Sequence, residues 1–414
     1  MKKNQGFTLI ELLAVVVILA VIALISVPLI MNIIDGAQKG ALQNTAYGIA
    51  EAGKYAYTSE VIKDGSAKLT AYTYVDGVET SSPTGKNLNY KGEKPKAGTI
   101  LINSKGDIAM AVYNGKYCAE KGFDDVEVIV TTKAEADCVL LESLTEVEIL
   151  VVAGGGAGGS HKVVATGTGA GGGGAGGLLY QQSYLVTAGT PIEVIVGVGG
   201  ISPTITAGTG GSGGNSTFGT LIAIGGGGGG ARSDFAPTSG GSGGGVGYDT
   251  TIGAAGTTGQ GNKGGDSASA VYGGTGGGGA GAPGQYSSGA FGTSGGNGLY
   301  YGDIFGNNFG VNGYFAGGGG GGSHSSGLIV GPGGLGGGGA GGLNSNGQDG
   351  IANTGSGGGG AGPSTFVGGN GGSGTVIVRY YGPQRANGGA ITTVGDYTIH
   401  TFTSGTATFE PLDL

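Results

Sequence analysis

Few residues of this chain could carry out chemistry. Its 414 residues include three histidines and two cysteines, namely His161, His324, His400, Cys118 and Cys138. They are too few and too widely spaced for a Cys/His metal site. The sequence also lacks GxxxxGK[ST] and HExxH, the motifs of phosphate-binding loops and zinc proteases. We therefore predict no enzyme, no catalytic residue, no cofactor and no metal.

One carboxylate is unusual because of its surroundings. Glu11 lies at the start of a run that is apolar from Leu12 to Ile25 and continues, through Ser26 and Pro28, to Met31. A carboxylate at the centre of a bilayer costs ~2.5–3.5 kcal/mol on insertion scales. An ionisable group in such a place is a functional candidate that needs a partner.

The apolar run is long enough to span a membrane. The 28 residues from Phe7 to Ile34 would extend roughly 40 Å as a helix, and a span needs ~20 residues. Lys2 and Lys3 should stay in the cytoplasm, which places the remainder of the chain outside. A secretory signal peptide fits poorly, because its apolar core has only about 7–15 residues before a cleavage site.

The segment Gly6-Phe7-Thr8-Leu9-Ile10-Glu11, after a short basic leader, resembles the N-terminus of type IV pilins. The resemblance implies that a prepilin peptidase cuts between Gly6 and Phe7 and methylates the new α-amine of Phe7. It also implies that Glu11 acts in assembly, paired with the Phe7 amine of a neighbouring subunit or of its own chain. Pro28 should kink or locally melt the helix during assembly, unless the kink merely faces lipid.

Residues 35–145 predict a small head. A helix is expected from Asp35 to Glu60, with a stop at Lys63-Asp64-Gly65. Strand-like runs follow at Thr99–Asn103, Asp107–Tyr113, Lys116–Ala119 and Val126–Val130. This order resembles the pilin head.

Many pilins close a C-terminal loop with a disulfide, and the resemblance implies a Cys118–Cys138 bridge outside the membrane. Two free thiols are the alternative. Within that loop, Asp124, Asp125 and Glu127 form an acidic cluster, which we interpret as a solvated loop rather than a calcium site.

Composition changes near residue 150. Residues 154–414 hold 92 of the 105 glycines but only 14 of the 46 charged residues. Strand-like runs lie between glycine blocks at Glu146–Ala153, Ile192–Val198, Leu221–Ile224, Thr375–Tyr381 and Tyr397–Phe402. Spaced apolar residues favour an ordered bundle of polyglycine-II helices over a flexible linker. A valine at Gly319, inside a block, should be far more disruptive than one at Gly284, which we interpret as lying in a loop.

Runs such as Val151-Val152-Ala153-Gly154-Gly155-Gly156 and Thr375–Tyr380 resemble glycine-rich modules of phage tail adhesins and bacterial surface proteins. In such adhesins the glycine runs form a polyglycine-II sandwich, and loops at its distal end contact the receptor. The densest aromatic stretch supplies the candidate binding residues, although the same side chains could fill a small core. They are Tyr300, Tyr301, Phe305, Phe309, Tyr314 and Phe315.

The predicted fold class is α+β, with a transmembrane helix, a small antiparallel pilin-like sheet and a glycine-rich β/polyglycine-II domain. We expect four parts: a leader at 1–6, a transmembrane and filament-core helix at 7–34, the head at 35–145 and a display domain at 146–414.

These parts predict a type IV pilus subunit, minor or specialised, that displays an adhesive domain. The expected partners are a prepilin peptidase, other pilin subunits, the inner membrane and a surface or glycan receptor. A net charge of −8 argues against nucleic acid. The protein would cross the cytoplasmic membrane once and later reach the extracellular pilus. A secretion or competence pseudopilin and a membrane-anchored adhesin that never polymerises are the alternatives.

Overall fold

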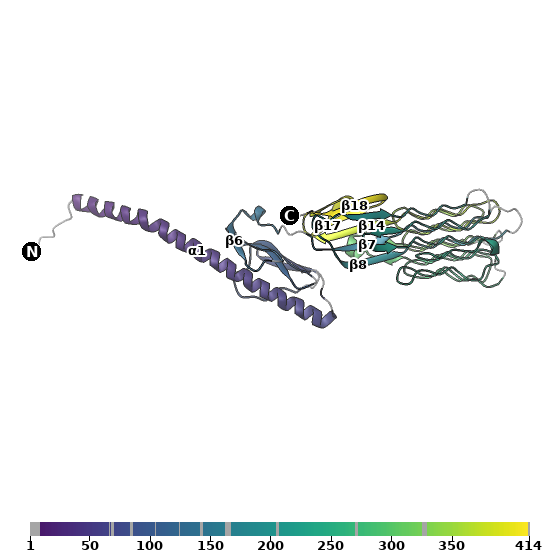
Figure 1. Ribbon diagram of the computed structural model, residues 1–414, viewed down its shortest axis with the longest axis horizontal. Helices are drawn as coiled ribbons and strands as arrows, with labels where there is room; N and C mark the ends of the chain where they lie inside the picture. The colour runs from purple at the N-terminus through teal and green to yellow at the C-terminus, as the bar shows by residue number, and fades with distance from the viewer. Residues whose placement is uncertain are drawn as a thin grey trace, which may run out of the picture. The chain divides into compact units, whose positions relative to one another are not determined.

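The computed structural model describes residues 9–65, 67, 70–82, 86–103, 105–123, 125–140, 144–161, 167–203, 207–269, 272–324 and 329–412. The chain divides into two compact units, Met1–Glu142 and Ser143–Leu414. Figure 1 shows the long helix and small sheet of the first unit, and the strands and glycine-rich segments of the second.

The first unit is organised by α1, which runs from Leu9 to Asp64. Its N-terminal half is the apolar run, and Pro28 lies inside the helix, where it removes one backbone hydrogen bond. Gly65 has a φ of +76°, the left-handed conformation that commonly ends a helix. The predicted stop at Lys63-Asp64-Gly65 is therefore confirmed.

Six antiparallel strands form the head sheet in the order β2-β1-β3-β4-β5-β6. They are β1 (Thr70–Val75), β2 (Val78–Ser82), β3 (Ala97–Ile102), β4 (Ile108–Tyr113), β5 (Tyr117–Lys121) and β6 (Ile129–Thr132). The hairpin predicted at 99–113 is confirmed as β3 and β4, whereas β6 begins three residues later than the predicted run. Strands β1 and β2 were not predicted, although Asp76-Gly77 joins them with positive φ at both residues, as a tight hairpin turn requires.

Both faces of the head sheet are covered. The second half of α1 buries Leu42, Ala46 and Ile49 against one face, while Cys118, Cys138 and Tyr113 cluster on the other. A disulfide joins Cys118 to Cys138, with Cα atoms 5.6 Å apart. It closes the loop that contains the short 3-10 helix Glu135–Asp137, and the predicted bridge is confirmed.

The second unit contains two five-stranded antiparallel sheets, ordered β16-β17-β14-β7-β8 and β11-β10-β9-β18-β15. The first contains β7 (Glu146–Val152), β8 (Leu178–Leu185), β14 (Thr375–Tyr381), β16 (Ala390–Val394) and β17 (Tyr397–Phe402). The second contains β9 (Ile192–Val196), β10 (Ser216–Phe218), β11 (Leu221–Ala223), β15 (Ala386–Asn387) and β18 (Gly405–Pro411). Side chains of both sheets, including Val151, Val378, Phe218 and Phe409, form a common core.

The glycine blocks leave these sheets as extended segments that run to the far end of the unit (Figure 1). Consecutive N–H groups bond three different neighbouring segments, and the pattern repeats every third residue. In one segment the bonds run from Gly154, Ala157 and Ser160 to Gly214, Gly211 and Gly208; from Gly155 and Gly158 to Gly372 and Gly369; and from Gly156 and Gly159 to Gly174 and Gly171. A threefold repeat with only lateral bonds defines polyglycine II, so the predicted bundle is confirmed.

Carbonyl groups complete this lateral bonding. The segment 154–161 also accepts bonds from Gly200, Gly226 and Gly358, so it contacts six neighbours in all. A Cβ at Gly319 would lie 2.0 Å from the Gly358 oxygen, and one at Gly284 would lie 2.0 Å from the Gly276 oxygen. The predicted contrast between Gly319 and Gly284 is therefore wrong, because Gly284 is also bonded within the bundle, to the Lys263 oxygen.

Candidate functional site

The two halves of α1 have different surroundings. From Leu9 to Ile34 every side chain except Ser26 is exposed, and this region contains Glu11 and Pro28. The helix is long and apolar enough to cross a membrane. The predicted cleavage residues Gly6 and Phe7 lie outside the described residues.

Asp35 lies where the apolar half of α1 ends. Its carboxylate accepts hydrogen bonds from Lys116 Nζ at 2.8 Å and from the Tyr117 hydroxyl, and Lys39 Nζ lies 3.0 Å away. These donors, Lys116 foremost, hold the pKa of Asp35 well below its usual range. The cluster joins the helix to β5 at the residue that follows the apolar run.

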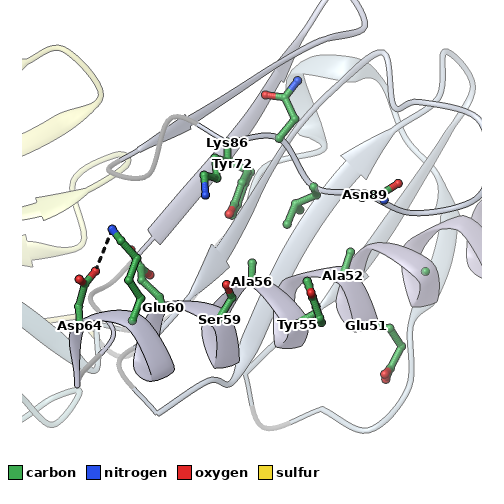
Figure 2. Close-up of a pocket in the computed structure, with 14 residues that line it drawn as sticks. Glu51, Ala52, Tyr55, Ala56, Ser59, Glu60, Asp64, Tyr72, Lys86 and Asn89 are labelled. Atoms are coloured by element: carbon green, nitrogen blue, oxygen red, sulfur yellow. Dashed lines mark ion pairs between the residues drawn. The ribbon is translucent and has the colours of Figure 1, made fainter.

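An open groove of about 820 Å³ runs along the C-terminal half of α1. Figure 2 shows Ala52, Ala56 and Ser59 on the helix, with Tyr72 of β1 on the opposite wall. The charged side chains that line it have both signs, Glu51, Glu60 and Asp64 against Lys63 and Lys86. This mixture does not select a ligand of one charge.

The aromatic stretch at 300–315 lies against the sheets. It forms β12 (Leu299–Tyr300), the short helix α2 (Gly302–Phe305) and β13 (Tyr314–Phe315). Phe305 and Phe315 are fully buried against Leu150 and Ile377 of the first sheet, with Tyr301 and Phe309 packed beside them. The interpretation of Phe305 and Phe315 as surface contact residues is wrong, because they fill a core.

A largely buried ion pair attaches this stretch to the sheet, with 14% of the Arg379 side chain and 19% of the Glu148 side chain exposed. Arg379 of β14 donates to the Glu148 carboxylate from Nη2 at 2.8 Å and from Nε at 3.1 Å. It also donates to the Ile304 carbonyl and lies 5.5 Å from the centroid of the Phe305 ring. Tyr300, in contrast, is 39% exposed.

A second set of rings lies at the opposite end of the bundle. Segments 224–232 and 316–324 follow β11 and β13, and eight residues of polyglycine II span ~25 Å. Their last residues, Arg232 and His324, therefore lie at the distal end. There Tyr272 stacks on Tyr248, with ring centroids 5.4 Å apart and planes at 24°, and its centroid lies 5.1 Å from that of His324.

Backbone bonds extend this row on both sides. The N–H of Tyr248 donates to the carbonyl of Ala231, next to Arg232, and the N–H of His324 donates to Ala290, next to Phe291. We call Arg232, Tyr248, Tyr272, His324 and Phe291 the distal row. The distal row was not predicted, although each of its members lies within two residues of a glycine.

The remaining histidines are structural. His400 is buried, with Nε2 2.9 Å from the Tyr380 hydroxyl and Nδ1 2.7 Å from the Gly388 oxygen. Burial lowers the pKa of His161 and of His400. Among the residues that the structure describes, no group of three or more His, Cys, Asp or Glu could hold a metal ion.

Two family models match the chain. Residues 131–381 match a glycine-rich domain, which is more than half of the sequence. The chain belongs to the glycine-rich domain family. This glycine-rich protein also matches the prokaryotic N-terminal methylation motif at residues 1–27. Among curated proteins, none matches it.

The N-terminal match gives this member of the glycine-rich domain family a type IV pilin-like start. The motif implies processing by a prepilin peptidase and pilus assembly, and it indicates a membrane location followed by the pilus or cell surface. Pilin-like proteins are typically structural subunits rather than enzymes.

Proposed function

We propose that this protein is a minor or specialised subunit of a type IV pilus. Its N-terminal helix builds into the filament, and its glycine-rich unit is displayed outward as an adhesive domain. In this proposal residues 1–6 are removed, 7–34 form the filament core, 35–145 form the head and 146–414 form the display domain.

The division of α1 carries this proposal. The helix continues unbroken through Asp35, yet its side chains are exposed before this residue and become buried against the head sheet after Leu42. A soluble head would not need about 26 exposed, mostly apolar positions. A membrane first and neighbouring helices later would cover them.

Glu11 supplies the proposed register between subunits. After cleavage at Gly6, the α-amine of Phe7 would be a cation at the same level of the membrane. A carboxylate and an amine from neighbouring subunits neutralise each other in a medium of low dielectric constant, where pairing is strong if the geometry is good. Pro28, which lacks a backbone donor, would let the helix bend or open locally as subunits pack.

Processing is the first test. Gly6→Val should block cleavage, because a branched side chain obstructs a protease cleft that accepts glycine. Mass spectrometry of the wild-type protein should find N-methyl-Phe7 as the first residue. A mature protein that keeps Met1, or that is cut beyond Ile25, would overturn the pilin proposal.

Assembly is the second test. Glu11→Val should leave membrane insertion intact and strongly reduce incorporation into sheared filaments, while the neighbouring change Ile10→Val should have little effect. An antibody against residues 146–414 should label filaments. Diffuse labelling of the membrane would instead favour an anchored adhesin, and wild-type assembly of Glu11→Val would remove the proposed role of this carboxylate.

A further inference from the structure

We propose that the head docks on the membrane that α1 crosses, by binding the headgroup of an anionic phospholipid in a groove beside Asp35. This groove of about 630 Å³ lies between residues 38–45 of α1, the loop 91–93 and the turn 114–117. We call it the membrane-proximal groove. The inference rests on the proposed membrane stage of the subunit, and it adds a lipid ligand that this stage does not itself require.

The groove begins at the level of the lipid headgroups. The exposed apolar half of α1 ends at Ile34, and Asp35 follows it. A helix rises ~1.5 Å per residue, so Gln38 lies ~5 Å beyond Asp35 along the helix axis and Thr45 lies ~15 Å beyond it. The headgroup layer on each side of the hydrocarbon core is about 5–8 Å thick. Headgroups of a membrane around α1 would therefore reach the near end of the groove.

Two ammonium groups are held in place at this end of the head. Lys116 Nζ lies 2.8 Å and Lys39 Nζ lies 3.0 Å from the oxygens of the Asp35 carboxylate. Both also face the Tyr117 ring, at 4.6 Å and 5.4 Å from its centroid. One carboxylate neutralises only one of the two lysines, so one positive charge remains. Because these side chains are already ordered, little of their conformational entropy would be lost when a phosphate binds.

Charge favours an anionic lipid over a neutral one. Lys91 and Glu93 line the groove together with Lys116. With Lys39 and Asp35 beside them, three lysines stand against two carboxylates, a net charge of +1, whereas the whole chain carries −8. Positive groups next to a membrane surface attract anionic lipids. An acidic protein thus presents a positive end to the membrane.

The remaining lining suits a headgroup that carries hydroxyls. Gln38, Asn44 and Asn114 line the groove with amide side chains. Amides both donate and accept hydrogen bonds, and a carboxylate such as Glu93 accepts them from hydroxyls. A phosphoglycerol headgroup, with one phosphate charge and free hydroxyls, matches a lining of two lysines, one carboxylate and three amides.

The larger groove farther along α1 lacks both features. Its first lining residue on the helix is Gly48, ~20 Å beyond Asp35. Three carboxylates line it against two lysines. Headgroups would neither reach that groove nor be attracted by its charge, so we assign the lipid to the membrane-proximal groove alone.

The test compares the full chain in nanodiscs of phosphatidylcholine with the full chain in nanodiscs that also contain phosphatidylglycerol. Acetylation of each lysine by an N-hydroxysuccinimide ester is measured at low salt by mass spectrometry. Lys91 and Lys116 should react about fivefold more slowly in the anionic nanodiscs, because an anionic surface contributes about 1 kcal/mol per lysine. Lys63, in the last turn of α1, should react equally in both.

Substitutions then separate the groove from a diffuse surface charge. Lys91→Gln removes one charge from the groove and keeps the Asp35 cluster, so it should abolish most of the protection of Lys116. Lys91→Arg should restore that protection. Lys94→Gln is the matched control, because the structure describes Lys94 as exposed in the same loop but not as lining the groove. It should leave Lys116 protected.

Three outcomes would overturn the proposal. They are equal reactivity of Lys116 in the two kinds of nanodisc, equal effects of Lys91→Gln and Lys94→Gln, and equal protection by soluble glycerol 3-phosphate, which would indicate a site for free phosphate. Thermal unfolding of each variant shows whether a loss reflects the fold. Cleavage at Gly6 and filament incorporation are scored separately, so a failure here leaves the pilus proposal standing.

Discussion

The two ends of the glycine-rich unit are held together by different groups. Near the sheets, large side chains interlock, as Phe218 and Phe409 do with ring centroids 5.6 Å apart. In the bundle, segments such as 169–177 have hardly any side chains, and each backbone bonds its neighbours at 2.7–3.0 Å. The first end resembles an ordinary hydrophobic core, whereas the second depends on backbone hydrogen bonds.

Because of this difference, the two ends should respond to different kinds of substitution. Ordering glycine costs more conformational entropy than ordering any other residue, so the bundle needs nearly all of its lateral bonds, each worth ~1 kcal/mol net. A side-chain core loses stability in proportion to the volume removed. The bundle instead loses stability when a side-chain atom is added, because a Cβ would push the hydrogen-bonded backbones apart.

We therefore expect the largest loss of stability from a substitution that adds only one methyl group. Gly319→Ala adds one methyl group whose carbon would lie 2.0 Å from the Gly358 oxygen. Since Gly319 also bonds Gly173, several lateral bonds must break together. We expect the unit to lose its resistance to proteolysis and to unfold at a much lower temperature.

Gly289→Ala is the matched control, because a Cβ there has nothing within 4 Å. It should behave as the wild type in both assays. If Gly319→Ala were equally stable, the bundle would be looser than its hydrogen bonds indicate, and the contrast between the two ends would fail.

The next effect is expected at the sheets. Arg379→Met should cost about 3 kcal/mol, the lower end of the range for a buried pair, because Glu148 loses its cation but is 19% exposed and still accepts a hydrogen bond from the Tyr180 hydroxyl. The double variant Arg379→Met with Glu148→Leu should recover much of this loss, since no charge then remains. Denaturant unfolding of both variants measures the difference. A double variant that is no more stable than the single one would show that the pair contributes through packing.

Much of this architecture could be predicted from local patterns. The sequence predicts the apolar run, the helix end at Gly65 and the strands β7, β14 and β17. It can do so because hydrophobic periodicity and helix-end signals depend on neighbouring residues only. The hairpin of β1 and β2 had an equally local signal at Asp76-Gly77. The sequence therefore contained enough information to predict this hairpin.

The candidate site could not be predicted in the same way. Composition favoured the stretch 300–315 because it is dense in rings, but density does not distinguish a core from a surface. Tyr248, Tyr272 and His324 are 24 and 52 positions apart in sequence. Only the return of each segment to the same end of the bundle brings them together, and that depends on long-range backbone bonding.

A third prediction contrasts the two units. Replacing Cys118 and Cys138 by alanine should destabilise the head by ~3 kcal/mol, the expected effect of opening a loop of this length. The glycine-rich unit contains no cysteine, so its proteolysis pattern should not change. Limited proteolysis with antibodies to each unit separates the two responses. A shift in the glycine-rich unit would show that the units stabilise each other.

The smallest effect is expected from acid, at the sheets. Arg385 donates its backbone N–H to the Tyr380 oxygen at 2.9 Å, so the Tyr380 hydroxyl proton is directed to His400 Nε2. The imidazole is then neutral, with its proton on Nδ1 donated to the Gly388 oxygen. A second proton on Nε2 would face an oxygen whose own proton points at it.

Burial thus lowers the pKa of His400 in the folded protein below the ordinary value of 6.5. The unfolded chain binds the proton first as pH falls, so stability is complete above pH 6.5 and declines below it. For each such histidine the slope can reach at most about 1.4 kcal/mol per pH unit, and His161, whose pKa is also lowered by burial, adds to the decline. Thermal unfolding between pH 8 and pH 5 should show the decline, and His400→Gln should reduce it. An unchanged slope in that variant would assign the acid sensitivity to His161 or to other groups.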